Sequence, residues 1–206
     1  MREPINVSGM VLSASPVGEY DKRVVILTRE LGKITAFARG ARRMKSPLMA
    51  VSNPFVFGEF QVYEGRDSYT LSGANIKEYF LDLAQMQPGV YYGFYFLELA
   101  EYFGQEGNDE TQMLNLLYVT MNAIRSGKQD LRLIRCIFEL RTITISGEAP
   151  QMFSCMECGT KENLTVFSLR DSAIYCPNCG KTIRDPWPLQ PGTVLACRYI
   201  IAAPLA

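Results

Sequence analysis

Residues 155–159 read Cys-Met-Glu-Cys-Gly, and residues 176–180 read Cys-Pro-Asn-Cys-Gly. Two C-x-x-C pairs at this separation are typical of a structural zinc site, because each short turn aims two thiolates at one metal ion. Four sulfur ligands complete a tetrahedral shell and leave no position for a reactive water. The sequence therefore predicts one structural Zn²⁺ ion with the ligands Cys155, Cys158, Cys176 and Cys179.

Disulfide bonds and a dithiol redox site are the alternatives for these cysteines. A redox C-x-x-C pair usually opens the helix of a thioredoxin-like β-α-β unit, and neither pair has such surroundings. Metal-bound thiolates in a chain without a signal-peptide pattern favour a cytoplasmic protein. Cys136 lies in an apolar helical stretch, so we expect it to be buried.

The 206 residues include no histidine. This excludes a Ser-His-Asp triad, a Cys-His pair and an H-E-x-x-H metalloprotease. The sequence also has neither a Walker-type phosphate loop nor a G-x-G-x-x-G motif. We therefore predict no catalytic residues and favour a binding protein. A thiol enzyme with Cys155 or Cys176 as nucleophile and an assembly scaffold without a nucleic-acid role are the alternatives.

The first 75 residues have the pattern of β-strands joined by turns. Residues 33–39 alternate, with Ile34, Ala36 and Ala38 on one face of the predicted strand. Gly58 is expected at a bulge. Five short strands in so few residues favour a small closed barrel, and an OB-fold fits this number. The predicted strands are 5–15, 22–28, 33–39, 55–63 and 69–74.

The next region has helical periodicity. Helices are predicted at 91–103, 110–125 and 130–145, with Asp130 as an N-cap. Tyr91, Tyr95 and Tyr102 are expected to extend the apolar face of the first helix. No apolar run is long enough to cross a bilayer. The sequence thus predicts an α+β multidomain protein: an OB-fold barrel at 1–78, a helical domain at 79–150, a zinc finger at 151–185, and the start of a C-terminal helical segment at 186–206.

The net charge is zero, but residues 22–45 hold eight basic side chains against one acidic side chain, Glu30. OB-folds commonly bind single-stranded nucleic acid, using cations for phosphates and flat side chains for bases. We predict a polyanion-binding surface there and regard Phe37 as a weaker candidate for stacking on a base. The residues predicted to bind are Lys22, Arg23, Lys33, Arg39, Arg42, Arg43 and Lys45.

Residues 18–34 read Gly-Glu-Tyr-Asp-Lys-Arg-Val-Val-Ile-Leu-Thr-Arg-Glu-Leu-Gly-Lys-Ile, and residues 38–43 read Ala-Arg-Gly-Ala-Arg-Arg. Together with Pro54-Phe55 and the four-cysteine module, these segments resemble the RecO family of bacterial recombination mediators. The resemblance covers essentially the whole chain, in the order barrel, helices and metal module. Family members usually carry further helix after the finger, and residues 193–201 have the pattern of its start.

The resemblance implies a DNA repair and homologous recombination mediator without catalytic activity, located in the bacterial cytoplasm and associated with the nucleoid. Such a protein binds single- and double-stranded DNA and anneals complementary strands. It also helps to load recombinase, indirectly RecA, onto DNA coated by single-strand-binding protein. The implied partners are RecR and the C-terminal tail of single-strand-binding protein, with no membrane involved. A zinc-ribbon OB-fold protein that binds RNA or assists transcription is the alternative.

The aromatic residues of the helical region allow two interpretations. They form either a core shared with the barrel and finger, or a groove for an apolar peptide from a partner. Arg132, Arg135 and Arg141 are candidates for the cation that meets a peptide carboxylate, and the sequence singles out none of them.

Overall fold

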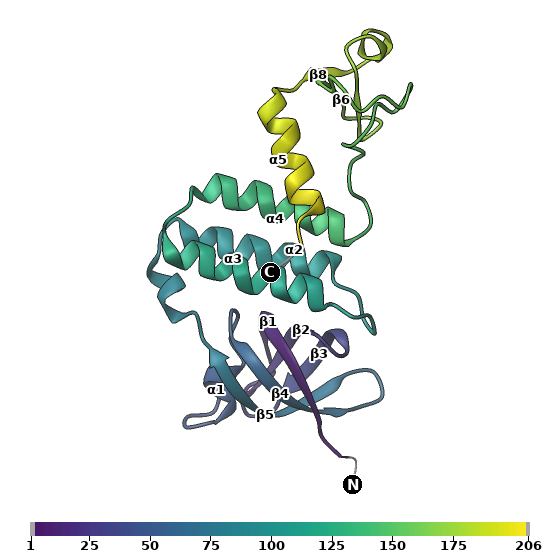
Figure 1. Cartoon of the computed structure of the whole chain (residues 1–206). Coiled ribbons are helices and arrows are strands. Elements are labelled where there is room, and N and C mark those ends of the chain that lie inside the picture. The colour runs from purple at the N-terminus through teal and green to yellow at the C-terminus, as the bar shows by residue number, and fades with distance from the viewer. Residues whose placement is uncertain (1–2, 205–206) are drawn as a thin grey trace. The chain divides into compact units, whose positions relative to one another are not determined.

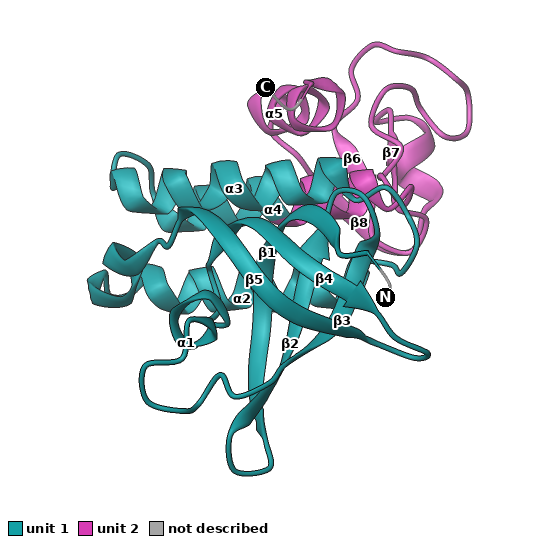
Figure 2. Cartoon of the chain, turned by 90° about the horizontal axis from the view of Figure 1, so that it is seen from below, with its two compact units in different colours: residues 1–138 teal, residues 139–206 magenta. Residues whose placement is uncertain are grey.

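The computed structural model describes residues 3–204 and divides them between two compact units, residues 1–138 and 139–206 (Figures 1 and 2). Compactness does not show which segment folds by itself, so the four domain boundaries expected from the sequence remain a prediction. Each unit is described on its own.

Unit 1 begins with a closed five-stranded barrel of order β1-β2-β3-β5-β4, which confirms the predicted OB-fold. β1 is long because its first part pairs with β4 and its second part with β2. The barrel is closed by a short parallel pairing of β3 with β5, in which Ala36 lies opposite Tyr69 and Phe37 lies opposite Thr70. The strands are β1 (Ile5–Val17), β2 (Asp21–Thr28), β3 (Gly32–Ala38), β4 (Phe57–Glu64) and β5 (Tyr69–Glu78).

The alternation predicted for β3 is confirmed, since Ile34, Ala36 and Ala38 are buried inside the barrel. Gly58 lies at a register shift between β4 and β5, so the predicted bulge is also confirmed. A Cβ atom on Gly58 would lie 2.5 Å from the Asn75 carbonyl oxygen, a distance that forbids a side chain there. The segment between β3 and β4 includes one helical turn, α1 (Leu48–Val51).

The helices α2 (Gly89–Phe103) and α3 (Thr111–Ser126) lie side by side over one side of the barrel (Figure 1). Rings of Phe55 and Phe94 lie 4.7 Å apart between centroids, as do those of Phe57 and Tyr118. The continuous apolar run of β2 follows from this packing, because helices cover the outward side chains that solvent would otherwise meet. The elements are η1 (Leu81–Gln85), α2 (Gly89–Phe103), α3 (Thr111–Ser126) and the first part of α4 (Leu131–Ile145).

Asp130 caps α4 as expected, since its Oδ1 accepts a hydrogen bond from the Arg132 backbone N–H at 2.7 Å. Two predictions of burial in these helices are wrong. Tyr91 and Tyr102 are 63% and 80% exposed, so they do not extend the core face of α2. Cys136 is exposed on α4.

Unit 2 contains the end of α4, a small sheet of order β7-β6-β8, and α5 (Pro191–Ala202), which confirms the helix expected at 193–201. The sheet strands are β6 (Val166–Ser168), β7 (Ala173–Tyr175) and β8 (Pro186–Pro188), and η2 (Cys179–Thr182) lies before β8. Leu164 and Ile174 form the core of the module together with Val194 of α5. No helix among residues 3–204 has the length and apolar character needed to span a membrane.

Candidate nucleic-acid interface and metal centre

One end of the barrel carries most of the predicted basic residues. The β1–β2 hairpin turns at Gly18–Tyr20, and the loop after β3 folds back onto this turn. The Arg42 backbone N–H donates to the Tyr20 carbonyl oxygen at 2.8 Å, and the Gly40 N–H donates to Asp21 Oδ1 at 2.7 Å. Arg42 also donates from Nη1 to the Gly18 carbonyl oxygen at 3.1 Å. These bonds fix a loop that has no regular structure of its own.

Six predicted residues share this end, and we call them the basic patch: Lys22, Arg23, Arg39, Arg42, Arg43 and Lys45. Strand pairing places Lys22 opposite Ala38 and Arg23 opposite Phe37, so both lie beside the start of the loop. The Lys22 ammonium group donates to Asn53 Oδ1 at 2.7 Å. Burial, and then the positive charge of Arg42, lower the pKa of Lys22.

The basic patch keeps its charge available. Residues 18–23 and 39–45 hold six basic and two acidic side chains, Glu19 and Asp21, a net charge of +4. Ion pairs within residues 3–204 include Lys77–Glu59, Arg125 with Glu78 and Asp82, and Arg132–Asp130. None of them includes a residue of the patch. Unpaired cations fixed on one exposed end produce a local positive field that attracts polyanions.

Lys33 does not belong to this group. It lies at the other end of β3, about 20 Å from Arg39 along the strand at 3.3 Å per residue. Its ammonium group donates to the Glu101 carbonyl oxygen of α2 at 2.6 Å. Strand pairing and this contact therefore separate Lys33 from the patch, and its predicted role in polyanion binding gains no support.

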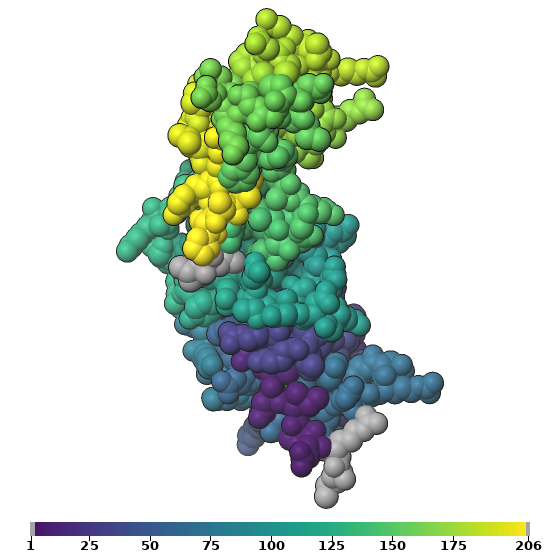
Figure 3. All heavy atoms as spheres, turned by 45° about the vertical axis from the view of Figure 1, so that its right-hand side comes forward, coloured from purple at the N-terminus to yellow at the C-terminus, as the bar shows by residue number. Residues whose placement is uncertain are grey.

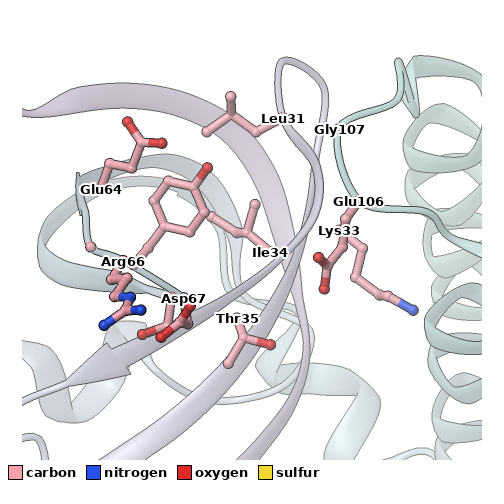
Figure 4. Close-up of a pocket in the computed structure, with 12 residues that line it drawn as sticks. Leu31, Lys33, Ile34, Thr35, Glu64, Arg66, Asp67, Glu106 and Gly107 are labelled. Atoms are coloured by element: carbon pink, nitrogen blue, oxygen red, sulfur yellow. The ribbon is translucent and has the colours of Figure 1, made fainter.

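A cleft of about 290 Å³ opens beside Lys33, between β3, the β4–β5 hairpin and the loop at 106–107 (Figure 4). The hairpin stands out from the barrel in the space-filling view, in blue (Figure 3). Glu64, Asp67 and Glu106 line the cleft, and the Lys33 side chain extends away from its centre. Burial and then the charges of Glu64 and Glu106 raise the pKa of Tyr69. Arg66 also lines the cleft, so its lining carries charges of both signs.

Phe37 and Tyr20 differ in their access to solvent. Phe37 is half-buried on the outer face of β3, opposite Arg23. Tyr20 is 43% exposed at the hairpin turn, and the Arg43 guanidinium carbon lies 4.9 Å from the centroid of its ring. Sequence reasoning missed Tyr20, although its place between a turn glycine and two basic residues gave a signal.

A second surface of unit 1 is aromatic. Tyr91, Tyr92 and Tyr95 of α2 and Arg135 of α4 line a pocket of about 270 Å³. The Arg135 guanidinium carbon lies 5.7 Å from the Tyr95 ring centroid. The sequence did not predict this lining, because the pocket combines side chains of α2 with one from α4, and the sequence does not show that these two helices meet there.

The four predicted metal ligands come together in unit 2. Their sulfur atoms all lie within 4.8 Å of one another, and the Cys158 and Cys176 sulfurs are 3.8 Å apart. A disulfide bond requires about 2.05 Å, whereas a tetrahedron with metal–sulfur bonds of about 2.3 Å has edges of about 3.8 Å. Backbone bonds from Gly159 N–H to the Cys155 oxygen and from Gly180 N–H to the Cys176 oxygen, each 2.9 Å long, close the two turns. The residues thus fit a tetrahedral metal ion.

The backbone around these sulfurs favours the thiolate form that binds metals. Burial alone would raise the pKa of Cys155, but N–H groups of Cys158, Cys176 and Glu157 lower it to about 6. The pKa of Cys179 is raised to about 12, first because its thiol hydrogen-bonds to Cys176. Four adjacent sulfurs cannot all carry negative charge without a cation to neutralise them. This arrangement suits a soft divalent metal.

Comparison with known proteins connects both regions to one family. The family model described as "Recombination protein O N terminal" matches residues 1–80, and "Recombination protein O C terminal" matches residues 89–206. A DNA repair protein RecO from Alkaliphilus metalliredigens (strain QYMF) is 36% identical over 96% of this chain and 81% of its own length. A DNA repair protein RecO from Bacillus pumilus (strain SAFR-032) is 32% identical over 94% of this chain and 75% of its own length.

Proposed function

The chain belongs to the RecO family of DNA repair proteins, and we propose that it acts by holding DNA strands on the basic patch. The family supports a role in DNA repair and recombination. Binding of single- and double-stranded DNA and annealing of complementary strands are the activities that we assign to the barrel. The family also favours DNA over RNA as the polynucleotide.

One observation carries the proposal: six cations are gathered at one end of an OB-fold barrel and none of them is in an ion pair with a described acid. Arginine presents a fork of donors that matches phosphate oxygens. Because the loop is already fixed by its backbone bonds, little ordering entropy is lost when DNA arrives.

The mechanism that we infer is charge neutralisation. Two complementary strands repel each other through their phosphates, and a cationic surface that holds one strand lowers this repulsion for the second. The contacts are to the backbone, so sequence preference should be slight. No reacting group is required, and we propose that the protein acts without catalysis of bond cleavage.

A triple variant tests the proposal. Replacing Arg39, Arg42 and Arg43 with alanine should weaken binding of a labelled single-stranded oligonucleotide about 100-fold at 0.1 M salt. Three phosphate contacts change the affinity by about two powers of ten for each tenfold change in salt concentration, and 0.1 M lies one such step below the 1 M reference. Strand annealing should slow in parallel. A control that replaces the exposed lysines Lys128, Lys161 and Lys181 with alanine should behave like the parent protein. Equal affinities for the parent and the triple variant would overturn the assignment.

We further propose that the aromatic pocket of Tyr91, Tyr92, Tyr95 and Arg135 receives the acidic, apolar tail of single-strand-binding protein. Its rings offer apolar surface, and Arg135 offers a cation for a carboxylate. Arg141 is unsuited to this role, since its Nη1 donates to three carbonyl oxygens at the end of α5. Contact with RecR, loading of recombinase and a cytoplasmic, nucleoid-associated location complete the proposal, on the strength of the family alone.

For the cysteine cluster we propose Zn²⁺ as the ion. Its ligands would be Cys155, Cys158, Cys176 and Cys179, and a closed four-sulfur shell would stabilise the fold of the module and leave no position for substrate. The identity of the ion is tested by metal analysis of the purified protein, in which one zinc per chain is expected.

A further inference from the structure

Tyr20 occupies an unusual position for a large aromatic side chain. It ends the three-residue turn Gly18–Tyr20 and leaves 43% of its surface exposed. Arg42 and Arg43 belong to a different loop, yet Arg42 donates to the Tyr20 carbonyl oxygen at 2.8 Å and Arg43 lies over the Tyr20 ring at 4.9 Å. Tyr20 therefore contacts two residues of the basic patch, Arg42 through its backbone and Arg43 through its ring.

The backbone beneath the ring is fixed from both sides. Gly18, two residues before Tyr20, accepts a hydrogen bond from Arg42 Nη1, and Asp21, the next residue, accepts one from the Gly40 N–H. A ring held on a braced turn loses little conformational entropy when a flat ligand stacks on it. Phe37 is less accessible to a stacking ligand, because its side chain is half-buried against the barrel.

The cations around Tyr20 bind phosphates, which single strands and duplexes share. An exposed ring offers something that only an unpaired base can use, because bases in a duplex already stack on one another. Base stacking on an aromatic side chain tolerates any sequence, since every base has a flat face. Arg43 lies over one face of the ring, so an incoming base would stack on the opposite face.

We propose that Tyr20 is the stacking platform for an unpaired base and that it makes the patch prefer single-stranded over duplex DNA. This inference rests on the proposed DNA-binding function. It assigns to Tyr20 the base contact, and to the surrounding arginines the phosphate contacts.

The experiment measures three ligands by fluorescence anisotropy: oligothymidine, an abasic strand of equal length, and a duplex. Tyr20→Ala should weaken binding of oligothymidine about 5- to 150-fold, the range for loss of one stacked base. Binding of the abasic strand and the duplex should change less than twofold. Tyr20→Phe should bind all three like the parent, and Tyr20→Leu, which is apolar but not aromatic, should behave like Tyr20→Ala.

Tyr63 on β4 provides a matched control, since it is 37% exposed on the same barrel and outside the patch. Tyr63→Ala should leave all three affinities unchanged. Thermal unfolding of each variant verifies the fold. Unchanged binding of oligothymidine by Tyr20→Ala would overturn the inference. So would an equal loss for the abasic strand, since Tyr20 would then only position arginines. If the parent protein itself bound no DNA, the proposed function would fail instead.

Discussion

The basic patch and the cysteine module are both built from loops, but different forces hold them together. In the patch, like charges are brought together by hydrogen bonds that the loop backbone donates, such as those from Gly40 N–H to the Asp21 carboxylate and from Arg42 N–H to the Tyr20 carbonyl oxygen. In the module, four sulfurs lie within 4.8 Å of one another and need a cation to balance their charge. The first site is therefore formed before its ligand arrives, whereas the second depends on its ligand for stability.

Metal removal should give the largest effect and the sharpest contrast. Chelation should unfold the segment from Met152 to Leu189, because its small core cannot offset the lost metal bonds, which are worth about 10 kcal/mol or more in small zinc modules. α5 should loosen as well, since Val194 shares that core and Arg198 Nε donates to the Met152 oxygen at 2.7 Å. Hydrogen exchange should report the change in unit 2 while the barrel stays protected.

Purified protein with no bound metal, four titratable thiols in these positions and undiminished protection of the module would contradict this expectation. Barrel amides that lose protection together with the module would show instead that the two sites are not independent.

Arg141 should give the next largest effect, again confined to unit 2. It is 8% exposed, and its Nη1 donates to the oxygens of Ile200, Ile201 and Ala203. Arg141→Ala should lower the free energy of unfolding by about 2 kcal/mol, the scale of hydrogen bonds to a charged group. Urea unfolding followed by Trp187 fluorescence measures it, and DNA binding by the barrel should not change. A variant as stable as the parent would show that α5 is held in another way.

Asp21 tests whether backbone bonding really organises the patch. Asp21→Ala removes the acceptor of the Gly40 N–H and should weaken DNA binding about fivefold, the equivalent of one hydrogen bond. Asp21→Asn keeps an acceptor oxygen and removes the negative charge, so its affinity should equal or exceed that of the parent. If both variants bound DNA more tightly by the same factor, only the charge of Asp21, and not its hydrogen bond to Gly40, would affect DNA binding by the patch.

The smallest effect concerns pH and a contact inside unit 1. A hydrogen bond from Arg125 lowers the pKa of Glu78 below its unfolded value. The contribution of this pair to stability is therefore present above the unfolded pKa and is lost as the pH falls through the folded pKa. Both side chains are about one-third exposed, so Glu78→Gln should cost under about 1 kcal/mol at pH 7. The difference between the two proteins should shrink as the pH falls through the lowered pKa of Glu78, and a difference that did not change with falling pH would refute this cause.

The sequence predicted what depends on local spacing. The alternation at Ile34, Ala36 and Ala38 indicated the face of β3, and the C-x-x-C turns identified all four clustered sulfurs. Both patterns are properties of one short segment, whose backbone geometry determines which side chains point together.

What the sequence did not predict depends on contacts between segments. Lys33 was grouped with Arg39 because the two are close in the chain, but an extended strand places them at opposite ends. The exposure of Tyr91, Tyr102 and Cys136 was missed because a helical pattern does not show which of its apolar positions another element covers. The stacking of Arg43 over Tyr20 depends on a loop that folds back across the hairpin.

The salt dependence of single-stranded DNA binding tests the role of the basic patch most directly. If about five phosphates are engaged, the logarithm of affinity should fall with the logarithm of salt concentration at a slope near −3.5 for the parent. The Arg39, Arg42 and Arg43 triple variant should show a slope near −1.4. The Lys128, Lys161 and Lys181 control should retain the parent slope. An identical slope for the parent and the triple variant would contradict the assignment of the patch as the DNA-binding surface.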